Sequence, residues 1–428
     1  MLSRCSQSRG RRIDGSTPGE WNRSGAFGFP LRRRPMRLSA SIPALAVALL
    51  SALVVTACGE GPTATVSGTV RTSTGAAIAG ASVTSGSVTA TTDADGRFEL
   101  QRLPVGRVTL STSAPRFDAR SEDLSLVEGS NAHDVVLLDQ TLFTHGEVRA
   151  YLPLGVAQYR AAIVFLPGLK DPATGNPLDS RDLVSGTWKG KCSIWCSPSV
   201  MEEVRQRSLA LAGGQVALVG TTTLVEQPAS YETLLTALSA LGTQSLHPEL
   251  ESIPLLFVGH SMGGCTAYGF SRAHGARVAG FITMKGACHD LGPAQAAASV
   301  PGYFLVGGAD EDYRRENITA VFEAGRAAGA PWAVSVDALG HDPMADLEQM
   351  FDWMDTVLTA RLPESAGAPL RAVTETAGWL GDRETGAIST YACYGSTPSS
   401  ASWLPSEETA LHWQETAQGT GVVRSCSR

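Results

Sequence analysis

A serine that could act as a nucleophile lies at residues 259–263, GHSMG, which match the pattern G-x-S-x-G. The apolar run Ile253 to Val258 precedes it and predicts a buried strand of a parallel sheet. Residues 263–274 predict a helix. A sharp turn from strand to helix places the Ser261 hydroxyl near free backbone N–H groups, which can stabilise a developing oxyanion. The pattern therefore predicts a nucleophilic serine, and the alternative is a glycine-rich turn with an ordinary serine.

This strand, turn and helix resemble the nucleophile elbow of the α/β-hydrolase family, in which an acid and a histidine follow later strands in that order. Asp310 ends the segment LVGGAD after one predicted strand, and His341 lies in ALGHD after the next. The resemblance implies a catalytic set of Ser261, Asp310 and His341, with Glu311 and Asp312 as adjacent alternatives for the acid. A serine hydroxyl needs such a base, and the base needs a carboxylate that fixes its tautomer.

The same resemblance implies an oxyanion hole made of the backbone N–H groups of Met262 and Leu169. Leu169 belongs to PGL at 167–169, after a predicted strand. The elbow GHSMGG is similar to those of secreted cutinases, polyester hydrolases and dienelactone hydrolases. The likeness implies ester hydrolysis through an acyl-enzyme, without metal or cofactor. His260 flanks the serine and is expected to point away from it.

Strands and helices alternate between residues 141 and 362, which predicts a mostly parallel sheet with helices on both faces. Further strands are expected at Arg160 to Leu166, Gln215 to Gly220, Val278 to Met284, Gly302 to Val306 and Trp332 to Val336. One helix is expected to begin at a capping box of Ser199 and Glu202, another at Ser230, and a last one to span Met344 to Arg361. The fold class is therefore α/β, and the resemblance implies an α/β-hydrolase domain at 141–362.

Residues 64–140 are rich in Thr, Ser, Val and Gly and predict a small all-β sandwich. Asp95-Gly96, between two alternating runs, predicts a hairpin. The segments GTV at 68–70, TDADGRF at 92–98 and LPVG at 103–106 resemble a carboxypeptidase regulatory-like domain. A spacer or adhesion role is expected for it.

The first 57 residues are interpreted as a leader with a lipoprotein signal peptide, followed by a linker at 58–63. Arginines precede the apolar run 42–57, which is short for a membrane span. The ending VTAC resembles a lipobox and implies a lipidated Cys58, an anchor in the bacterial cell envelope and, with Gly59 next, the outer membrane or cell surface. The alternative is a secretory signal cleaved near Ala57. The chain after residue 37 carries 25 basic and 39 acidic residues, a net charge of −14, which argues against a nucleic-acid partner.

Six cysteines lie beyond Cys58, an even number in a chain expected to be exported. The predicted disulfides are Cys192–Cys196, Cys265–Cys288 and Cys393–Cys426. Cys265 lies one helical turn beyond Ser261, and Cys288 follows the neighbouring strand, so both are expected at the carboxyl edge of the sheet. Two free buried cysteines are the alternative there.

Two segments leave their roles open. The long loop 170–198, with Trp188 and Trp195, could shape a substrate cleft or be a disulfide-tied flap. The C-terminal extension 363–428 contains Trp379, Trp403 and Trp413, which could form a carbohydrate platform or fill a small core.

An exported serine esterase acting on an ester substrate is the leading interpretation. A serine peptidase or acyltransferase could use the same three residues, because substrate choice depends on loop shape. A third interpretation is an inactive hydrolase domain in a glycan-binding envelope protein.

Overall fold

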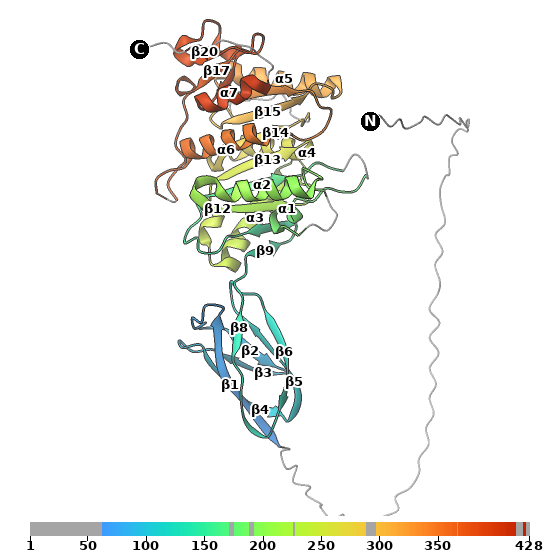
Figure 1. Ribbon diagram of the computed structural model, residues 1–428, viewed down its shortest axis with the longest axis vertical. Coiled ribbons are helices and arrows are strands. Elements are labelled where there is room, and N and C mark those ends of the chain that lie inside the picture. Colours follow the sequence, from blue (N-terminus) through green and yellow to red (C-terminus); the bar gives the residue numbers. More distant parts are fainter. Residues whose placement is uncertain are drawn as a thin grey trace, which may run out of the picture. The chain divides into compact units, whose positions relative to one another are not determined.

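The structure is a computed structural model that describes residues 62–170, 175–187, 192–225, 227–287, 297–365, 367–416 and 423–424 of the 428-residue chain. The leader, Cys58 and most of the linker lie outside these residues. No helix within the described ranges combines the length and apolar character needed to cross a membrane. Figure 1 shows the β-strands that follow residue 62 and the layered α/β part that begins with β9.

Residues 63–137 form two packed sheets, as expected for a β-sandwich. One sheet has the order β4-β1-β7, with β8 also paired to β1, and the other has the order β3-β2-β5-β6. Buried side chains alternate along the strands, for example Phe98 and Leu100 on β4. The strands are β1 (Thr63–Thr72), β2 (Ser82–Ser85), β3 (Val88–Thr91), β4 (Arg97–Pro104), β5 (Gly106–Ser113), β6 (Arg120–Leu126), β7 (Gly129–Ala132) and β8 (Val135–Leu137).

The turn at Asp95-Gly96 connects the two sheets, so the predicted hairpin is wrong. β3 precedes this turn and β4 follows it, and the two strands pair within different sheets. The turn itself needs glycine, because Gly96 has φ +77° and a Cβ there would lie 2.6 Å from the carbonyl oxygen of Val70. The local sequence therefore specifies the turn but not the sheet in which each flanking strand pairs.

An eight-stranded sheet has the order β16-β15-β14-β13-β11-β12-β10-β9 and is parallel from β12 to β16. β9 and β10 add an antiparallel edge. This mostly parallel sheet, covered by helices on both faces, is the α/β-hydrolase fold predicted from the sequence (Figure 1). Its strands are β9 (Leu142–His145), β10 (Val148–Tyr151), β11 (Ala161–Leu166), β12 (Val216–Thr221), β13 (Leu255–His260), β14 (Val278–Met284), β15 (Gly302–Gly307) and β16 (Trp332–Asp337).

The helices divide between the two faces of the sheet. Side chains of α3, α4 and α5 share one core cluster with Val164 and Phe257. Side chains of α1, α2 and α6 share the other cluster with Ile163 and Val258. Neighbouring strand residues thus serve opposite faces, as the period of a strand requires. The helices are α1 (Arg181–Ser185), α2 (Pro198–Ala210), α3 (Pro228–Ser245), α4 (Met262–Ala273), α5 (Asp312–Ala327) and α6 (Leu347–Arg361).

Two of these helices begin earlier than the sequence analysis expects. α2 begins at Pro198 and α3 at Pro228, so Ser199 and Ser230 lie inside the helices and are not their caps. Proline suits the first turn of a helix, because its φ is already helical and the N–H that it lacks would have no partner there.

The C-terminal extension covers the edge strand β16. Ser402 exchanges two hydrogen bonds of 3.0 Å with the backbone N–H and C=O of Val334, and Trp413 Nε1 donates to the same C=O at 2.7 Å. Trp403 and Trp413 are each 1% exposed, so they fill a core and do not form a carbohydrate platform. The extension contains β17 (Trp379–Gly381), β18 (Ile388–Thr390), β19 (Ser402–Leu404), α7 (Glu407–Thr416) and β20 (Val423–Arg424), with the sheet order β19-β17-β18-β20.

Candidate active site

Ser261 occupies a strained turn between β13 and α4. Its backbone has φ 53° and ψ −120°, a conformation that is costly for a residue with a Cβ. The flanking positions must be glycine for steric reasons. A Cβ on Gly259 would lie 2.3 Å from the Gly263 carbonyl oxygen. A Cβ on Gly263 would lie 2.0 Å from the Leu166 carbonyl oxygen. The G-x-S-x-G spacing is therefore the spacing that lets α4 pack tightly onto the sheet behind the serine.

The structure brings Ser261, His341 and Asp310 together in one hydrogen-bonded chain. His341 Nε2 lies 2.9 Å from Ser261 Oγ, and His341 Nδ1 lies 2.8 Å from Asp310 Oδ2. An ionised carboxylate only accepts hydrogen bonds, so Nδ1 carries the proton and Nε2 is left to accept from the serine hydroxyl. This tautomer suits a general base.

Asp310 is the acid that reaches His341 among the three adjacent candidates. Its side chain is 4% exposed, and its Oδ1 accepts from the Glu311 backbone N–H at 2.9 Å. The side chains of Glu311 and Asp312 are 66% and 80% exposed and pair with arginines of α5. Burial against the end of β15 therefore selects Asp310.

Both predicted oxyanion donors belong to segments that adjoin the serine. Met262 is the first residue of α4, where a backbone N–H has no partner within the helix. Leu169 lies in the loop after β11, and the preceding Gly168 is so close that a Cβ there would be 3.1 Å from Ser261 Cβ. Thr223 Oγ1 donates to the Gly168 carbonyl at 2.7 Å and fixes that loop.

Lys285 and Asp337 form a buried ion pair that the sequence analysis missed. The Lys285 side chain is 0% exposed, and its Nζ donates to Asp337 Oδ2 at 2.9 Å. Asp337 Oδ1 accepts from the backbone N–H of Leu339, two residues before His341. Lys285 directly follows β14 and has φ 57°. The pair joins the ends of β14 and β16. Because 52 residues separate its two members, no local sequence pattern predicts it.

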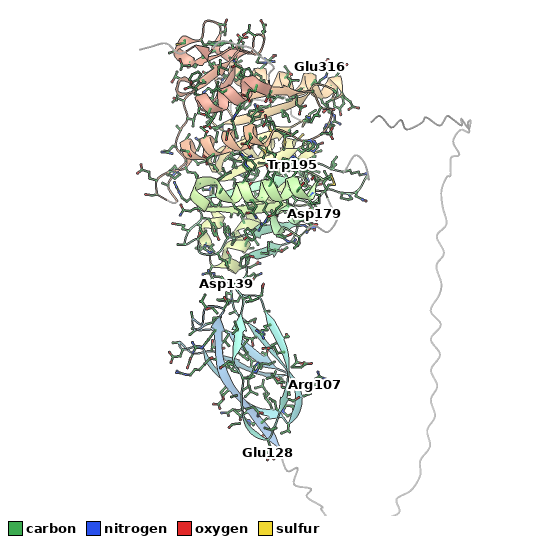
Figure 2. All side chains as sticks on the ribbon, in the orientation of Figure 1. Arg107, Glu128, Asp139, Asp179, Trp195 and Glu316 are labelled. Carbon is green, nitrogen blue, oxygen red and sulfur yellow. A yellow bond between two sulfur atoms is a disulfide. The ribbon has the colours of Figure 1, made fainter. Side chains whose placement is uncertain are left out.

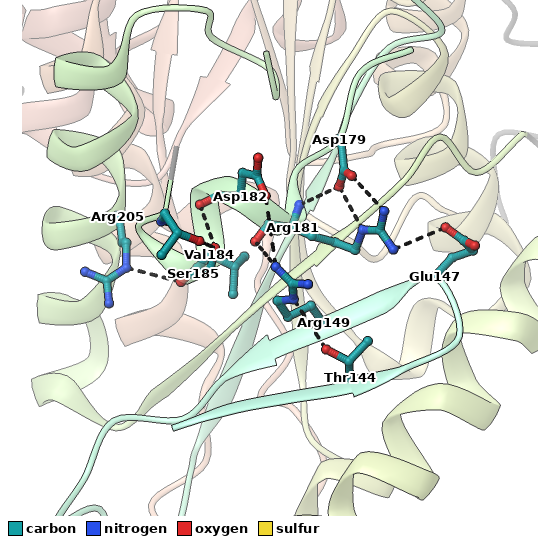
Figure 3. A network of polar contacts seen from close by, with 10 residues as sticks. Thr144, Glu147, Arg149, Asp179, Arg181, Asp182, Val184, Ser185 and Arg205 are labelled. Carbon is teal, nitrogen blue, oxygen red and sulfur yellow. Dashed lines mark hydrogen bonds and ion pairs between the residues drawn. The ribbon is translucent and has the colours of Figure 1, made fainter. Parts of the chain in front are cut away.

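A polar network holds residues 179–185 of the long loop against β10, as Figure 3 shows. Arg181 donates to Asp179 at 2.9 and 2.7 Å and pairs with Glu147 at 3.4 Å. Arg149 lies 4.0 Å from Asp182 and donates to the backbone of Arg181. Residues 179–185 are therefore fixed next to the antiparallel edge of the sheet.

Residues 192–198 of the same loop pack beside the segment that follows His341. Trp195 is 5% exposed, and its Nε1 donates to the Met344 carbonyl at 2.9 Å. A disulfide joins Cys192 and Cys196, as predicted. A groove of about 560 Å³ is lined by Trp195, by Val200 and Glu203 of α2, and by residues of the segment 339–348. Figure 2 labels Trp195 and Asp179. A disulfide therefore ties the loop, and its Trp195 lines a groove whose lining includes neither Ser261 nor His341, so a role of the loop in a substrate cleft stays a prediction.

Two more of the cysteines predicted to form disulfides do so. Cys265 and Cys393 are each disulfide-bonded. Their predicted partners, Cys288 and Cys426, lie outside the described residues, as do Trp188 and the lipidation candidate Cys58. Within the described ranges, no group of three or more His, Cys, Asp and Glu side chains is arranged to hold a metal ion.

Comparison with known proteins identifies one domain of the chain and finds solved structures to which the chain is similar. Residues 65–138 match the carboxypeptidase regulatory-like domain, as predicted. No curated protein matches the chain. Among solved structures, the chain is similar to a thermostable esterase (11% identity over 72% of this chain and 100% of that one, TM-score 0.35). It is also similar to a ferulic acid esterase (15%, 49% and 91%, TM-score 0.34) and to Zea mays acyl-protein thioesterase 2 (17%, 50% and 100%, TM-score 0.32).

Proposed function

We propose that this protein is a serine hydrolase that cleaves carboxylic esters through an acyl-enzyme. The observation that carries the proposal is the continuous chain from Ser261 Oγ through His341 to Asp310, with contacts of 2.9 and 2.8 Å. The three side chains come from the ends of three different strands. A hydroxyl, an imidazole and a buried carboxylate in this order form the arrangement that activates a serine.

Ser261 Oγ attacks the ester carbonyl carbon while His341 Nε2 takes the hydroxyl proton. The carbonyl oxygen becomes an oxyanion, and the backbone N–H groups of Met262 and Leu169 are the proposed donors to it. Collapse of the tetrahedral intermediate breaks the bond to the alcohol, which leaves with the proton from His341. Water, deprotonated by the same imidazole, then releases the acid and restores Ser261. Asp310 stabilises the imidazolium in both steps.

Substrate can reach this chain of groups from solution. The His341 side chain is 30% exposed, and Ser261 is half-buried. The groove at Leu339 and Met344, close in sequence to His341, is lined by apolar side chains together with the carboxylates of Glu203, Asp342, Asp346 and Glu348. This surface suits an uncharged ester with an apolar portion better than an anionic one.

Turnover of p-nitrophenyl esters of increasing acyl length, compared with peptide p-nitroanilides, tests the proposal. Purified wild-type protein is expected to hydrolyse the esters, and Ser261→Ala, with unchanged circular dichroism, is expected to lose that activity. Preferential cleavage of the anilides would favour the peptidase alternative. Ester cleavage that Ser261→Ala retains would overturn the assignment of the nucleophile.

We further propose that Cys58 is lipidated and anchors the enzyme in a bacterial envelope, with its hydrolase domain outside the cytoplasm. The VTAC segment supports this proposal, and so does the disulfide between Cys192 and Cys196, because disulfides persist in oxidising compartments. Two or more acyl chains are needed for stable anchoring. Mass spectrometry of the native N-terminus is the test. An N-terminal diacylglyceryl cysteine at 58 is expected, and an unmodified terminus downstream of it would exclude the anchor.

A further inference from the structure

His260, the last residue of β13, is a buried histidine next to the nucleophile and has no part in the reaction proposed above. It is 5% exposed. Its ring lies beside the ring of His341, with centroids 5.1 Å apart and planes tilted by 43°. Its Nε2 lies 3.0 Å from the backbone carbonyl oxygen of His341. The side chain therefore touches the very residue whose imidazole must meet Ser261.

The direction of this hydrogen bond is fixed by chemistry. A carbonyl oxygen only accepts, so His260 Nε2 must carry a proton and donate it. Burial lowers the pKa of His260 to about 3, with smaller contributions in the same direction from His341 and Lys285. The ring is therefore neutral near pH 7, with its one proton on Nε2. Nδ1 is buried and has no hydrogen-bond partner among the described residues. Within that part of the chain, the ring therefore makes one hydrogen bond, to the His341 carbonyl.

His260 also lies against the oxyanion loop. A Cβ placed on Gly168 would be 3.5 Å from His260 Nδ1 and 3.1 Å from Ser261 Cβ. The ring thus lies where the elbow, the loop of Gly168 and the segment of His341 meet. An ordinary core histidine would satisfy its nitrogens within its own surroundings, whereas this one leaves Nδ1 without a partner and keeps its bond to the His341 backbone.

We infer that His260 is a positioning residue for the proposed hydrolysis: its Nε2–H holds the backbone of His341 at the distance that lets the His341 ring bridge Ser261 and Asp310. The inference rests on the proposed function for its effect on rate, but the hydrogen bond itself is independent of the substrate. A displacement of about 1 Å would lengthen the 2.9 Å contact between His341 and Ser261 beyond hydrogen-bonding range. Such a misplacement can lower a rate on the order of 10²-fold.

Two variants separate the hydrogen bond from the packing. His260→Leu keeps an apolar side chain in the space but removes the donor. His260→Gln provides an amide N–H at about the same distance from the backbone as Nε2 and should retain part of the bond. His247 is the matched control, because it is also buried, is bonded to Glu249 at 2.9 Å, and precedes strand β13, whereas Ser261 follows that strand.

The measurements are kcat and KM on a p-nitrophenyl ester, the rate of labelling by a fluorophosphonate, and the low-field proton NMR signal of His341 Nδ1–H, assigned by its absence in His341→Ala. His260→Leu is expected to lower kcat and the labelling rate by on the order of 10²-fold, with KM nearly unchanged, and to weaken or shift the NMR signal. His260→Gln should recover at least one tenth of the wild-type kcat. His247→Leu should lower the melting temperature but leave kcat and the NMR signal unchanged.

Two failures can be told apart. If wild-type protein neither hydrolyses esters nor reacts with the fluorophosphonate, the proposed function fails, and the NMR signal still tests the role of His260. If wild-type protein is active through Ser261 but His260→Leu keeps its kcat, labelling rate and NMR signal, the inference about His260 is overturned. A loss in His260→Leu that His260→Gln does not recover at all would also overturn it, because packing rather than the donor would then be the cause.

Discussion

The carboxyl end of the large sheet and its covered edge at β16 both bury a cation, but the cation has a different role in each. At the carboxyl end, Lys285 pairs with Asp337, and both neighbouring turns at Ser261 and Lys285 have positive φ. At the edge, Arg326 donates to Ala401, Pro398 and Glu375 at 2.7 Å each. Among the described residues after Leu362, only glycines have positive φ.

The comparison indicates what each region is built for. The edge is sealed by a guanidinium with several acceptors on an unstrained chain, which is how a protein stabilises a covered sheet edge. The carboxyl end combines strained backbone, an ion pair and a histidine nitrogen without a recorded partner. Strained backbone conformations cluster at functional sites, where the packing around them holds them in place. Substitutions should therefore separate activity from stability according to region.

The largest effect is expected from the three reacting side chains at the carboxyl end. His341→Ala and Asp310→Asn should each lower kcat on a p-nitrophenyl ester by about 10⁴-fold, because the serine then lacks a base or the base lacks its tautomer. Asp312→Asn, one of the exposed neighbours, is the control and should stay within about twofold, since surface changes away from the site have little effect. A severe loss of kcat in Asp312→Asn together with a mild loss in Asp310→Asn would show that the acid is wrongly assigned.

Lys285→Met should lower both stability and activity, because it leaves the mostly buried Asp337 carboxylate without its cation. Loss of one partner of a buried pair costs about 3–5 kcal/mol of unfolding free energy. The loop that carries Leu339 and His341 would also lose its anchor. Urea titration and kcat measure the two effects.

The double variant Lys285→Met/Asp337→Asn tests whether the unpaired Asp337 carboxylate causes the loss of stability in Lys285→Met. It removes both ions and should regain most of the stability lost in Lys285→Met. If the double variant is as unstable as the single one, an unpaired charge is not the cause.

Arg326→Met should lower stability by a similar amount, about 3–5 kcal/mol, but leave kcat close to that of wild type. Its bonds go to the C-terminal extension and to Ala330, just beyond its own helix, and not to the loops around Ser261. Arg383→Met is the matched control, because the Arg383–Glu323 pair is more exposed and should contribute less than about 1 kcal/mol. A large fall in kcat for folded Arg326→Met would erase the distinction between the two regions.

The smallest expected effect is on the pH dependence of stability. An unfolded chain binds a proton at His260 below about pH 6.5, whereas the folded chain does so only near pH 3. The unfolded state therefore binds more protons in this window, and the unfolding free energy falls as the pH falls. His260 should contribute about 1.4 kcal/mol per pH unit. Urea titrations of wild type and His260→Leu between pH 6 and pH 4.5 measure it, and parallel slopes would contradict it.

Much of the fold could be predicted from the sequence because its signals are local. Buried apolar runs give the strands, and the chain order of Ser261, Asp310 and His341 follows from the ends of those strands. Contacts between distant residues could not be predicted in this way. The bond from His260 to His341 spans 81 residues, and Lys285 has no sequence feature that distinguishes it from a surface lysine. The turn at Asp95-Gly96 illustrates the same limit, since its local conformation was predictable and its strand partners were not.

The central claim is that Ser261 is a nucleophile activated by His341. The most direct test is to treat the folded protein with a fluorophosphonate, measure the intact mass, and locate the modified residue by peptide mapping. We expect one adduct per chain, on Ser261, formed at a rate that falls steeply in His341→Ala. No adduct on folded wild-type protein, or labelling of Ser261 at the same rate in His341→Ala, would contradict the claim.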